Sequence, residues 1–204
     1  MSEFFLELFS EEIPAGLQRN LRYALLESFQ KLFEEKQISF KKGSSFSTPN
    51  RLIILFEGLS KEITQKTEEI KGPNVNAPEK AIEGFLRSNQ INKKDLLKKK
   101  IEKGEFYFFK NPSRKINTID LLEEHVPLIL DNLQWKKSMK WGSYSLSWAR
   151  PLKSILAVFD GKSLSFKFHH LISSNTTFTD KEFEDRKKIF KDFKSYKIFF
   201  KQSG

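Results

Sequence analysis

The sequence contains no cysteine at all. Disulfide bonds, thiolate nucleophiles and cysteine-based zinc sites are therefore excluded. Hydrophobic runs of membrane-spanning length are also missing, and the N-terminal stretch MSEFFLELFSEEIP carries acidic side chains where a secretory signal would carry basic ones. These absences predict a cytoplasmic protein that makes no contact with a membrane.

Sequence motifs for nucleotide binding and serine hydrolysis are absent too. There is no G-x-G-x-x-G, no G-x-x-x-x-G-K-[ST] and no G-x-S-x-G pattern. The chain has only three histidines, and two of them, His169 and His170, are neighbours whose side chains would point to opposite faces of a strand, which disfavours a shared metal ion. The sequence therefore predicts no catalytic residue, no metal site and no cofactor held by this chain.

Acidic residues are in the minority. The chain has 36 lysine and arginine residues against 26 aspartate and glutamate residues, which gives a net charge of +10. A basic excess of this size favours contact with a nucleic acid or another polyanion. A compositional origin competes with this interpretation, because lysine, phenylalanine, isoleucine and asparagine are abundant throughout, as a genome rich in A and T would impose.

Apolar material for a core is plentiful, with 38% hydrophobic residues and 21 phenylalanines. Apolar positions recur at spacings of three and four from Leu17 to about Gln37, which predicts an amphipathic helix. Residues 152–170 indicate a hairpin with Asp160 and Gly161 at its turn. Strands, helices and antiparallel hairpins are intermixed, so the predicted class is α+β, with mixed or antiparallel sheets and packed helices.

The stretch KSMKWGSYSLSWARP, residues 137–151, combines cations with large aromatic side chains. Lys137, Lys140 and Arg150 suit phosphate groups, and Trp141 and Trp148 suit stacking on bases, so the stretch is a candidate RNA-facing surface. Alternatively the tryptophans are core anchors and the cations solvate the rim. We favour a core role for at least one tryptophan, because the stretch leads directly into an apolar strand.

Two adjacent carboxylates, Glu11 and Glu12, precede Pro14. Proline suits the first turn of a helix, and carboxylates are stabilised near a helix N-terminus by its backbone amides. A catalytic pair would need two facing carboxylates, which neighbours in sequence seldom provide. We therefore expect Glu11 or Glu12 to cap the helix, with Pro14 fixing where it begins.

Several stretches together resemble one family. In order they are ELFSEEIPAG, FSTPNRLIILFEGL, IKGP, KAIEGFLRSNQI, KGEFYFF and KSMKWGSYSLSWARPLKSILAVFDGK. Their sequence and spacing, over roughly the first 170 positions, resemble the N-terminal part of the β subunit of bacterial glycyl-tRNA synthetase. Within these motifs we take Arg51, which follows the Thr-Pro turn, as a structural residue alongside Glu11, Glu12 and Pro14.

The chain departs from the family pattern at three places. Phe9 and Ser10 stand where the family usually has Gly-Thr, and Asn50 stands where it usually has arginine. The family's Gly-His-Arg-Phe element is replaced by SNTTFTDKEFEDRKK, so any role of that element cannot be transferred. The family's later HD-type and anticodon-binding domains are missing, and the chain stops shortly after the apolar run YKIFF, so we interpret it as an N-terminal fragment.

The resemblance implies a subunit of an enzyme that attaches glycine to its tRNA. The implied complex has two α and two β subunits, with ATP, glycine and the activation chemistry on α and much of the tRNA contact on β. The implied domains are an α+β region, residues 1–178, similar to the editing-type domain of the phenylalanyl-tRNA synthetase β chain, and the start of a helical segment, residues 179–204. The alternative function is a stand-alone RNA-binding or hydrolytic editing-type module.

Overall fold

The computed structural model describes residues 2–65, 69–101, 104–110, 114–135, 138–179 and 187–202. The chain forms two compact units. The first is assembled from Met1–Ile63 and Asn117–Gly204, and the second, Thr64–Ile116, is inserted between these two segments. The sequence motifs did not predict this insertion.

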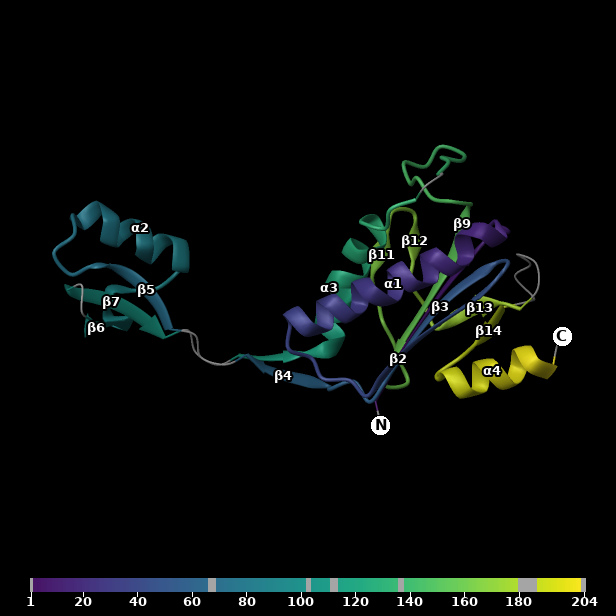
Figure 1. Ribbon diagram of the computed structural model, residues 1–204, viewed down its shortest axis with the longest axis horizontal. Coiled ribbons are helices and arrows are strands. Elements are labelled where there is room, and N and C mark those ends of the chain that lie inside the picture. The colour runs from purple at the N-terminus through teal and green to yellow at the C-terminus, as the bar shows by residue number, and fades with distance from the viewer. Residues whose placement is uncertain are drawn as a thin grey trace. The chain divides into compact units, whose positions relative to one another are not determined.

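A five-stranded antiparallel sheet is the centre of the first unit, with the strand order β10-β9-β1-β3-β2 (Figure 1). The central strand β1 reads EFFLELFS and is buried along almost its whole length, so both faces of the sheet are covered. The strands are β1 (Glu3–Ser10), β2 (Lys42–Thr48), β3 (Arg51–Glu57), β9 (Leu152–Phe159) and β10 (Lys162–Ser163).

Helix α1 (Ala15–Glu35) covers one face of this sheet. Its buried side chains are those of the stripe predicted from the sequence, namely Leu21, Leu25, Phe29, Leu32 and Phe33. Phe29 contacts Phe4 of β1 and Phe56 of β3, with ring centroids 5.3 and 6.2 Å apart. Helix α3 (Thr118–Asp131) contacts α1 and buries a second apolar stripe, although Pro127 lies within it.

The opposite face of the sheet is covered by the C-terminal elements (Figure 1). Helix α4 (Phe193–Gln202) places Tyr196 against Phe5 of β1, with ring centroids 4.9 Å apart. Strands β13 (Thr176–Phe178) and β14 (Lys187–Ile189) pair beside this helix. The ring centroids of Phe9 in β1 and Phe178 in β13 are 5.7 Å apart. The short strands β11 (Lys167–Phe168) and β12 (Leu171–Ile172) form a separate hairpin, and β4 (Glu62–Gln65) pairs with β8 (Arg114–Asn117).

The second unit is a three-stranded antiparallel sheet of order β5-β7-β6 with one α-helix. Its elements are β5 (Glu69–Asn74), α2 (Glu79–Asn89), a single 3-10 turn (Lys93–Asp95), β6 (Leu96–Ile101) and β7 (Gly104–Lys110). An added Cβ on Gly72 would lie 2.9 Å from Cε1 of Phe85, so glycine allows α2 to approach β5 closely.

The predicted α+β class, the helix over residues 17–37 and the hairpin after residue 152 are confirmed. Asp160 and Gly161 both have positive φ, 50° and 79°, as the turn chemistry requires. The boundary at residue 178 stays a prediction, and residues 187–202 pack in the same compact unit as β1. None of the described helices is long and apolar enough to cross a membrane.

Candidate functional site

A glutamate lies in the middle of the central strand. Glu7 of β1 is fully buried between Leu6 and Leu8, and strand alternation places its side chain on the α4 face of the sheet, with Phe5 and Phe9. A buried carboxylate is costly unless it is hydrogen-bonded and paired with a cation. This position therefore needs polar partners from elsewhere in the fold.

Three residues provide those partners. Arg51 Nη1 donates to Glu7 Oε1 at 2.9 Å, the hydroxyl of Thr177 donates to the same oxygen, and the Tyr196 hydroxyl donates to Oε2. Burial raises the pKa of Glu7, and the nearby Arg51 cation and the two hydroxyls offset part of that effect. Burial, and then the Glu7 charge, also raises the pKa of Tyr196, so its hydroxyl remains a donor at neutral pH.

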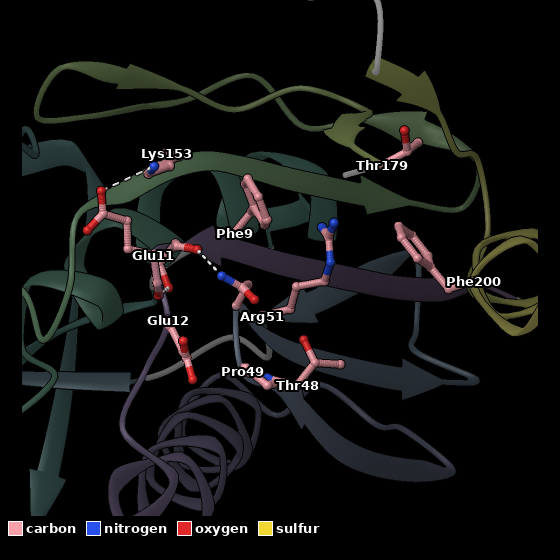
Figure 2. A pocket seen from close by; sticks show the side chains of 11 residues that line it. Phe9, Glu11, Glu12, Thr48, Pro49, Arg51, Lys153, Thr179 and Phe200 are labelled. Carbon is pink, nitrogen blue, oxygen red and sulfur yellow. Dashed lines mark hydrogen bonds and ion pairs between the residues drawn. The ribbon is translucent and has the colours of Figure 1, made fainter. Parts of the chain in front are cut away.

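Arg51 is held from several sides. Besides Glu7, its Nη1 donates to Thr177 Oγ1 at 3.0 Å, and its Nη2 donates to the carbonyl of Phe178 at 2.5 Å. Its guanidinium carbon lies 4.4 Å from the ring centroid of Phe9 and 4.6 Å from that of Phe200, between the two rings (Figure 2). The arginine thus joins β3, β13 and α4 to β1.

A cavity of about 760 Å³ lies next to this network, where one end of the sheet meets three loops. Backbone bonds hold the loops together: Ser10 N donates to Asn50 O at 2.9 Å, and Glu11 N donates to Pro151 O at 3.0 Å. Figure 2 shows Arg51 between Phe9 and Phe200 at this cavity. The cavity is lined by Phe9, Ser10, Glu11, Glu12, Thr48, Pro49, Asn50, Arg51, Lys153, Thr179 and Phe200.

The predicted carboxylate cap is wrong. The residue before α1 is Pro14, with φ −53° and ψ 132°, and no side chain donates or accepts a capping hydrogen bond there. The carboxylate of Glu11 instead turns toward the β9 strand, where it pairs with Lys153 Nζ at 3.3 Å (Figure 2). The side chain of Glu12 is exposed at the cavity, and its backbone carbonyl accepts from Arg150 Nε at 3.2 Å.

One tryptophan of the predicted loop is a core residue. Trp148 is 1% exposed, and its ring centroid lies 4.3 Å from that of Trp135 and 5.9 Å from that of Phe168. Backbone bonds in both directions pair it with Met139. The preferred core role for at least one tryptophan is therefore confirmed.

The outer part of this loop is anchored by ring stacking. Tyr144 stacks on His170, with centroids 3.7 Å apart and an interplanar angle of 9°, and Trp141 approaches the same histidine at 6.2 Å. Burial lowers the pKa of His170. Lys140 is exposed and Trp141 half-buried, whereas Lys137 lies outside the described residues. Arg150 instead lies beside Glu12 and Pro14, so the structure does not join these cations into one described cluster.

A serine, a histidine and an aspartate also meet beside this loop. His169 Nε2 lies 2.8 Å from Asp131 Oδ1, and its Nδ1 lies 3.3 Å from Ser145 Oγ. The Asp131 side chain is 57% exposed, whereas a hydrolase triad uses a buried carboxylate to orient its histidine. We interpret the trio as a link between the loop and α3. The described residues also contain no group of three acidic or histidine side chains that could hold a metal ion.

Nearly the whole chain, the residues around the cavity included, matches a known family. The family model described as "Glycyl-tRNA synthetase beta subunit" matches residues 4–203, which includes every residue lining the cavity. The chain belongs to this family. Matching relatives, all described as glycine–tRNA ligase β subunits, include those of Rickettsia typhi (41% identical over 197 residues), Rickettsia conorii (40% over 197) and Rickettsia felis (40% over 199). Each alignment covers 97% of this chain and 30% of the relative.

Sequence reasoning found Arg51 in the glycyl-tRNA synthetase β motif FSTPNR but missed its partners. Glu7 had a usable signal, because a single glutamate inside the apolar run FFLELF is unusual unless a cation pairs with it. Thr177, Tyr196 and Lys153 carried no comparable signal, since each is an ordinary residue type in its local context.

Proposed function

We propose that this chain is part of the β subunit of a glycine–tRNA ligase and supports the ATP-dependent attachment of glycine to tRNA. The match of residues 4–203 to the family carries this proposal. Its relatives are named for the same ligase. Because the chain spans 30% of their length, the activity belongs to a larger assembly.

The proposed role of this part is tRNA binding and subunit assembly rather than activation of glycine. In this proposal two α and two β subunits form a cytoplasmic enzyme in which α carries ATP and glycine. The described side chains that support contact with tRNA are the exposed Lys140, the half-buried Trp141, and Arg150, which lies beside Glu12 and Pro14. Lys137 is retained as a fourth candidate from the sequence.

A chimera tests this proposal. Residues 4–203 would replace the matching region of the Rickettsia typhi β subunit, and the product would be purified with that organism's α subunit and assayed for glycylation of tRNA. We expect activity within about tenfold of the parent enzyme, since the two sequences are 41% identical over 197 residues. A soluble, assembled chimera that cannot glycylate tRNA would contradict the proposal.

Charge variants of the chimera test the tRNA contact. Lys140→Ala with Arg150→Ala should raise KM for tRNA and leave KM for glycine unchanged, because the two cations are proposed to contact phosphates and not glycine. Lys36→Ala, a change at an exposed lysine at the end of α1, is the matched control. If the unchanged chimera, the double variant and the control variant had the same KM for tRNA, the positive charge would reflect the amino-acid composition of the chain and not tRNA binding.

The cavity supports a second candidate function, a hydrolytic editing-type module similar to that of the phenylalanyl-tRNA synthetase β chain. A volume of about 760 Å³ falls within the range of small-molecule sites, and ionisable side chains line it. The isolated chain incubated with tRNA carrying a wrong amino acid decides between the two. If the wild-type chain releases that amino acid and the Glu12→Gln variant does not, the editing function is favoured. If the aminoacyl-tRNA stays intact with the wild-type chain, the editing function is excluded.

A further inference from the structure

The three-stranded sheet of the second unit has one face covered by its own helix. An added Cβ on Gly72 of β5 would meet Phe85 of α2, so that helix lies on the Gly72 side of the sheet. Figure 1 shows α2 along one face of β5, β6 and β7. Tyr107 of β7 and Ile82 of α2 are both buried, at 9% and 7% exposure. These residues form the small core between helix and sheet.

Pairing registers define what lies on the opposite face. Phe108 of β7 is opposite Leu97 of β6 and Lys71 of β5, and Phe106 is opposite Lys99. Because side chains alternate along a strand, these residues all point away from α2. Within the described part of this unit no element covers them, and Leu97 is 45% exposed. We call this surface the open sheet face; it consists of Glu69, Lys71, Leu97, Lys99, Phe106, Phe108 and Lys110.

Two of the three lysines of the open sheet face lie near the phenylalanine rings. Lys71 Nζ lies 4.0 Å from the centroid of the Phe106 ring, and Lys99 Nζ lies 5.6 Å from that of Phe108. The face has one carboxylate, Glu69, which accepts from Lys99 at 2.6 Å and pairs with Lys110 at 3.7 Å. The hydrogen bond from Lys99 lowers the pKa of Glu69, so the carboxylate is charged at neutral pH.

Charge favours an anionic occupant for this face. The face carries three lysines and one carboxylate, and in residues 64–116 lysines and arginines outnumber aspartates and glutamates by six. The second unit therefore contributes more than half of the chain's net charge of +10. A protein surface that docked here through apolar contact alone would have to displace or bury these three ammonium groups, which is costly.

Aromatic spacing favours bases as the flat part of that occupant. Phe106 and Phe108 are two residues apart on one strand, so their Cα atoms are separated by roughly 7 Å. Unpaired bases stack on aromatic side chains projecting from a sheet, whereas bases in a duplex are already stacked on each other. Lysines on the two flanking strands are then positioned for the phosphates on either side.

We infer that the open sheet face binds unpaired nucleotides of the tRNA, with Phe106 and Phe108 stacking on bases and Lys71, Lys99 and Lys110 contacting phosphates. This deepens the proposed function by giving the inserted unit a defined share of the tRNA contact. In the free protein the ammonium group of Lys71 lies over the Phe106 ring and that of Lys99 is hydrogen-bonded to Glu69, and each moves to a phosphate as bases stack on the rings.

The test measures binding of the purified chain to a fluorescein-labelled dodecamer of uridine, by fluorescence anisotropy, with an RNA duplex of equal length as the second probe. Replacing Phe106 and Phe108 together by leucine keeps apolar volume but removes both ring faces. We expect at least about a tenfold loss of affinity for the single strand and little change for the duplex. Replacing both by tyrosine should retain binding, and Phe109→Leu, on the covered face of the same strand, should have little effect.

A second set of variants tests the contribution of charge to binding. Lys71→Gln is compared with Lys80→Gln, a matched control at an exposed lysine of α2. Only the first should weaken single-strand binding and flatten the dependence of log K on log salt by about 0.7. A third arm places an indole at the site: Phe108→Trp should lose fluorescence when the dodecamer binds.

Three results would overturn the inference. The first is equal affinity of the leucine variant and the wild-type protein for the single strand. The second is an equal loss of affinity for the single strand and the duplex in the leucine variant. The third is displacement of the labelled dodecamer by an acidic peptide but not by unlabelled RNA. Its fate is separable from that of the proposed function. If the chimera with both leucine substitutions still glycylates tRNA, and the substituted chain still binds the single strand with unchanged affinity, only this inference fails. If the wild-type chain binds the single strand but its chimera does not glycylate tRNA, only the ligase assignment fails.

Discussion

Replacing Arg51 by methionine should destabilise the first unit severely. The substitution keeps a long apolar side chain between Phe9 and Phe200 but leaves the buried Glu7 carboxylate without its cation, which lies 2.9 Å away. Breaking a buried ion pair by removing one partner typically costs about 3–5 kcal/mol. Since whole domains are stable by only about 5–15 kcal/mol, the expected loss is a large share of the total.

The loss should depend on pH in a defined direction. Burial already raises the pKa of Glu7, and removing the arginine raises it further. The folded variant then binds a proton over a pH range in which the unfolded chain does not, so its stability falls as pH rises through that range. The difference between wild type and Arg51→Met should therefore narrow as pH falls from 7 towards 5, by at most about 1.4 kcal/mol per pH unit.

Urea unfolding followed by tryptophan fluorescence measures this effect. All three tryptophans lie in the first unit, so the signal reports on the unit that contains the ion pair. The control is Glu7→Gln in the Arg51→Met background: with the charge gone, we expect a smaller loss of stability and no added pH dependence. A loss below about 1 kcal/mol in Arg51→Met, constant from pH 5 to 8, would refute the electrostatic reasoning.

Three further substitutions test separate parts of the fold. Glu11→Gln should cost less than about 1 kcal/mol in urea unfolding, because its pair with Lys153 is partly solvated; a loss near 2 kcal/mol would contradict this weak ion pair. Gly72→Ala, whose Cβ would lie 2.9 Å from Phe85, should destabilise the second unit by about 1–3 kcal/mol, seen as faster amide hydrogen exchange there with unchanged tryptophan unfolding. Trp148→Ala should cost about 3–5 kcal/mol in chemical unfolding; a tolerated change would contradict its core position.

Local periodicity predicted those parts of the fold that local forces determine. The stripe of α1 follows from spacings of three and four, and the Asp160-Gly161 turn follows from the backbone conformations that aspartate and glycine tolerate. The family resemblance also identified Arg51 as part of a motif. In these cases the information lies within a few residues along the chain.

The buried network and the inserted unit could not be predicted in the same way. Glu7 is paired with a residue 44 positions later and accepts a hydrogen bond from another 170 positions later, so no local pattern links them. Strand β7 of the inserted unit, read as sequence, is a short apolar run, as strands β3 and β9 of the main sheet are. Assigning it to a separate unit requires knowing which strands pair, which is a property of the whole chain.

The C-terminal elements complete the core of the first unit. Tyr196 donates to the buried Glu7, and the backbone N–H of Phe193 donates to Glu3 Oε1 at 2.7 Å. Together with Phe190 they cover an apolar sheet face that includes Phe5, Ile53, Leu55, Leu156 and Val158, none more than 6% exposed. Removing these elements would therefore expose both a charge and a core surface.

A chain ending at Phe178 should consequently fail to fold its first unit. Each core side chain returned to water costs about 1.5–3 kcal/mol, and five of them exceed the margin by which a small domain is stable. We expect loss of the near-ultraviolet circular dichroism signal and binding of a hydrophobic dye, which a chain ending at Gln202 should not show. If the shorter chain unfolded at the same urea concentration as the longer one, residues 187–202 would form an independent segment, and the boundary that the family resemblance implies at residue 178 would hold in energetic terms.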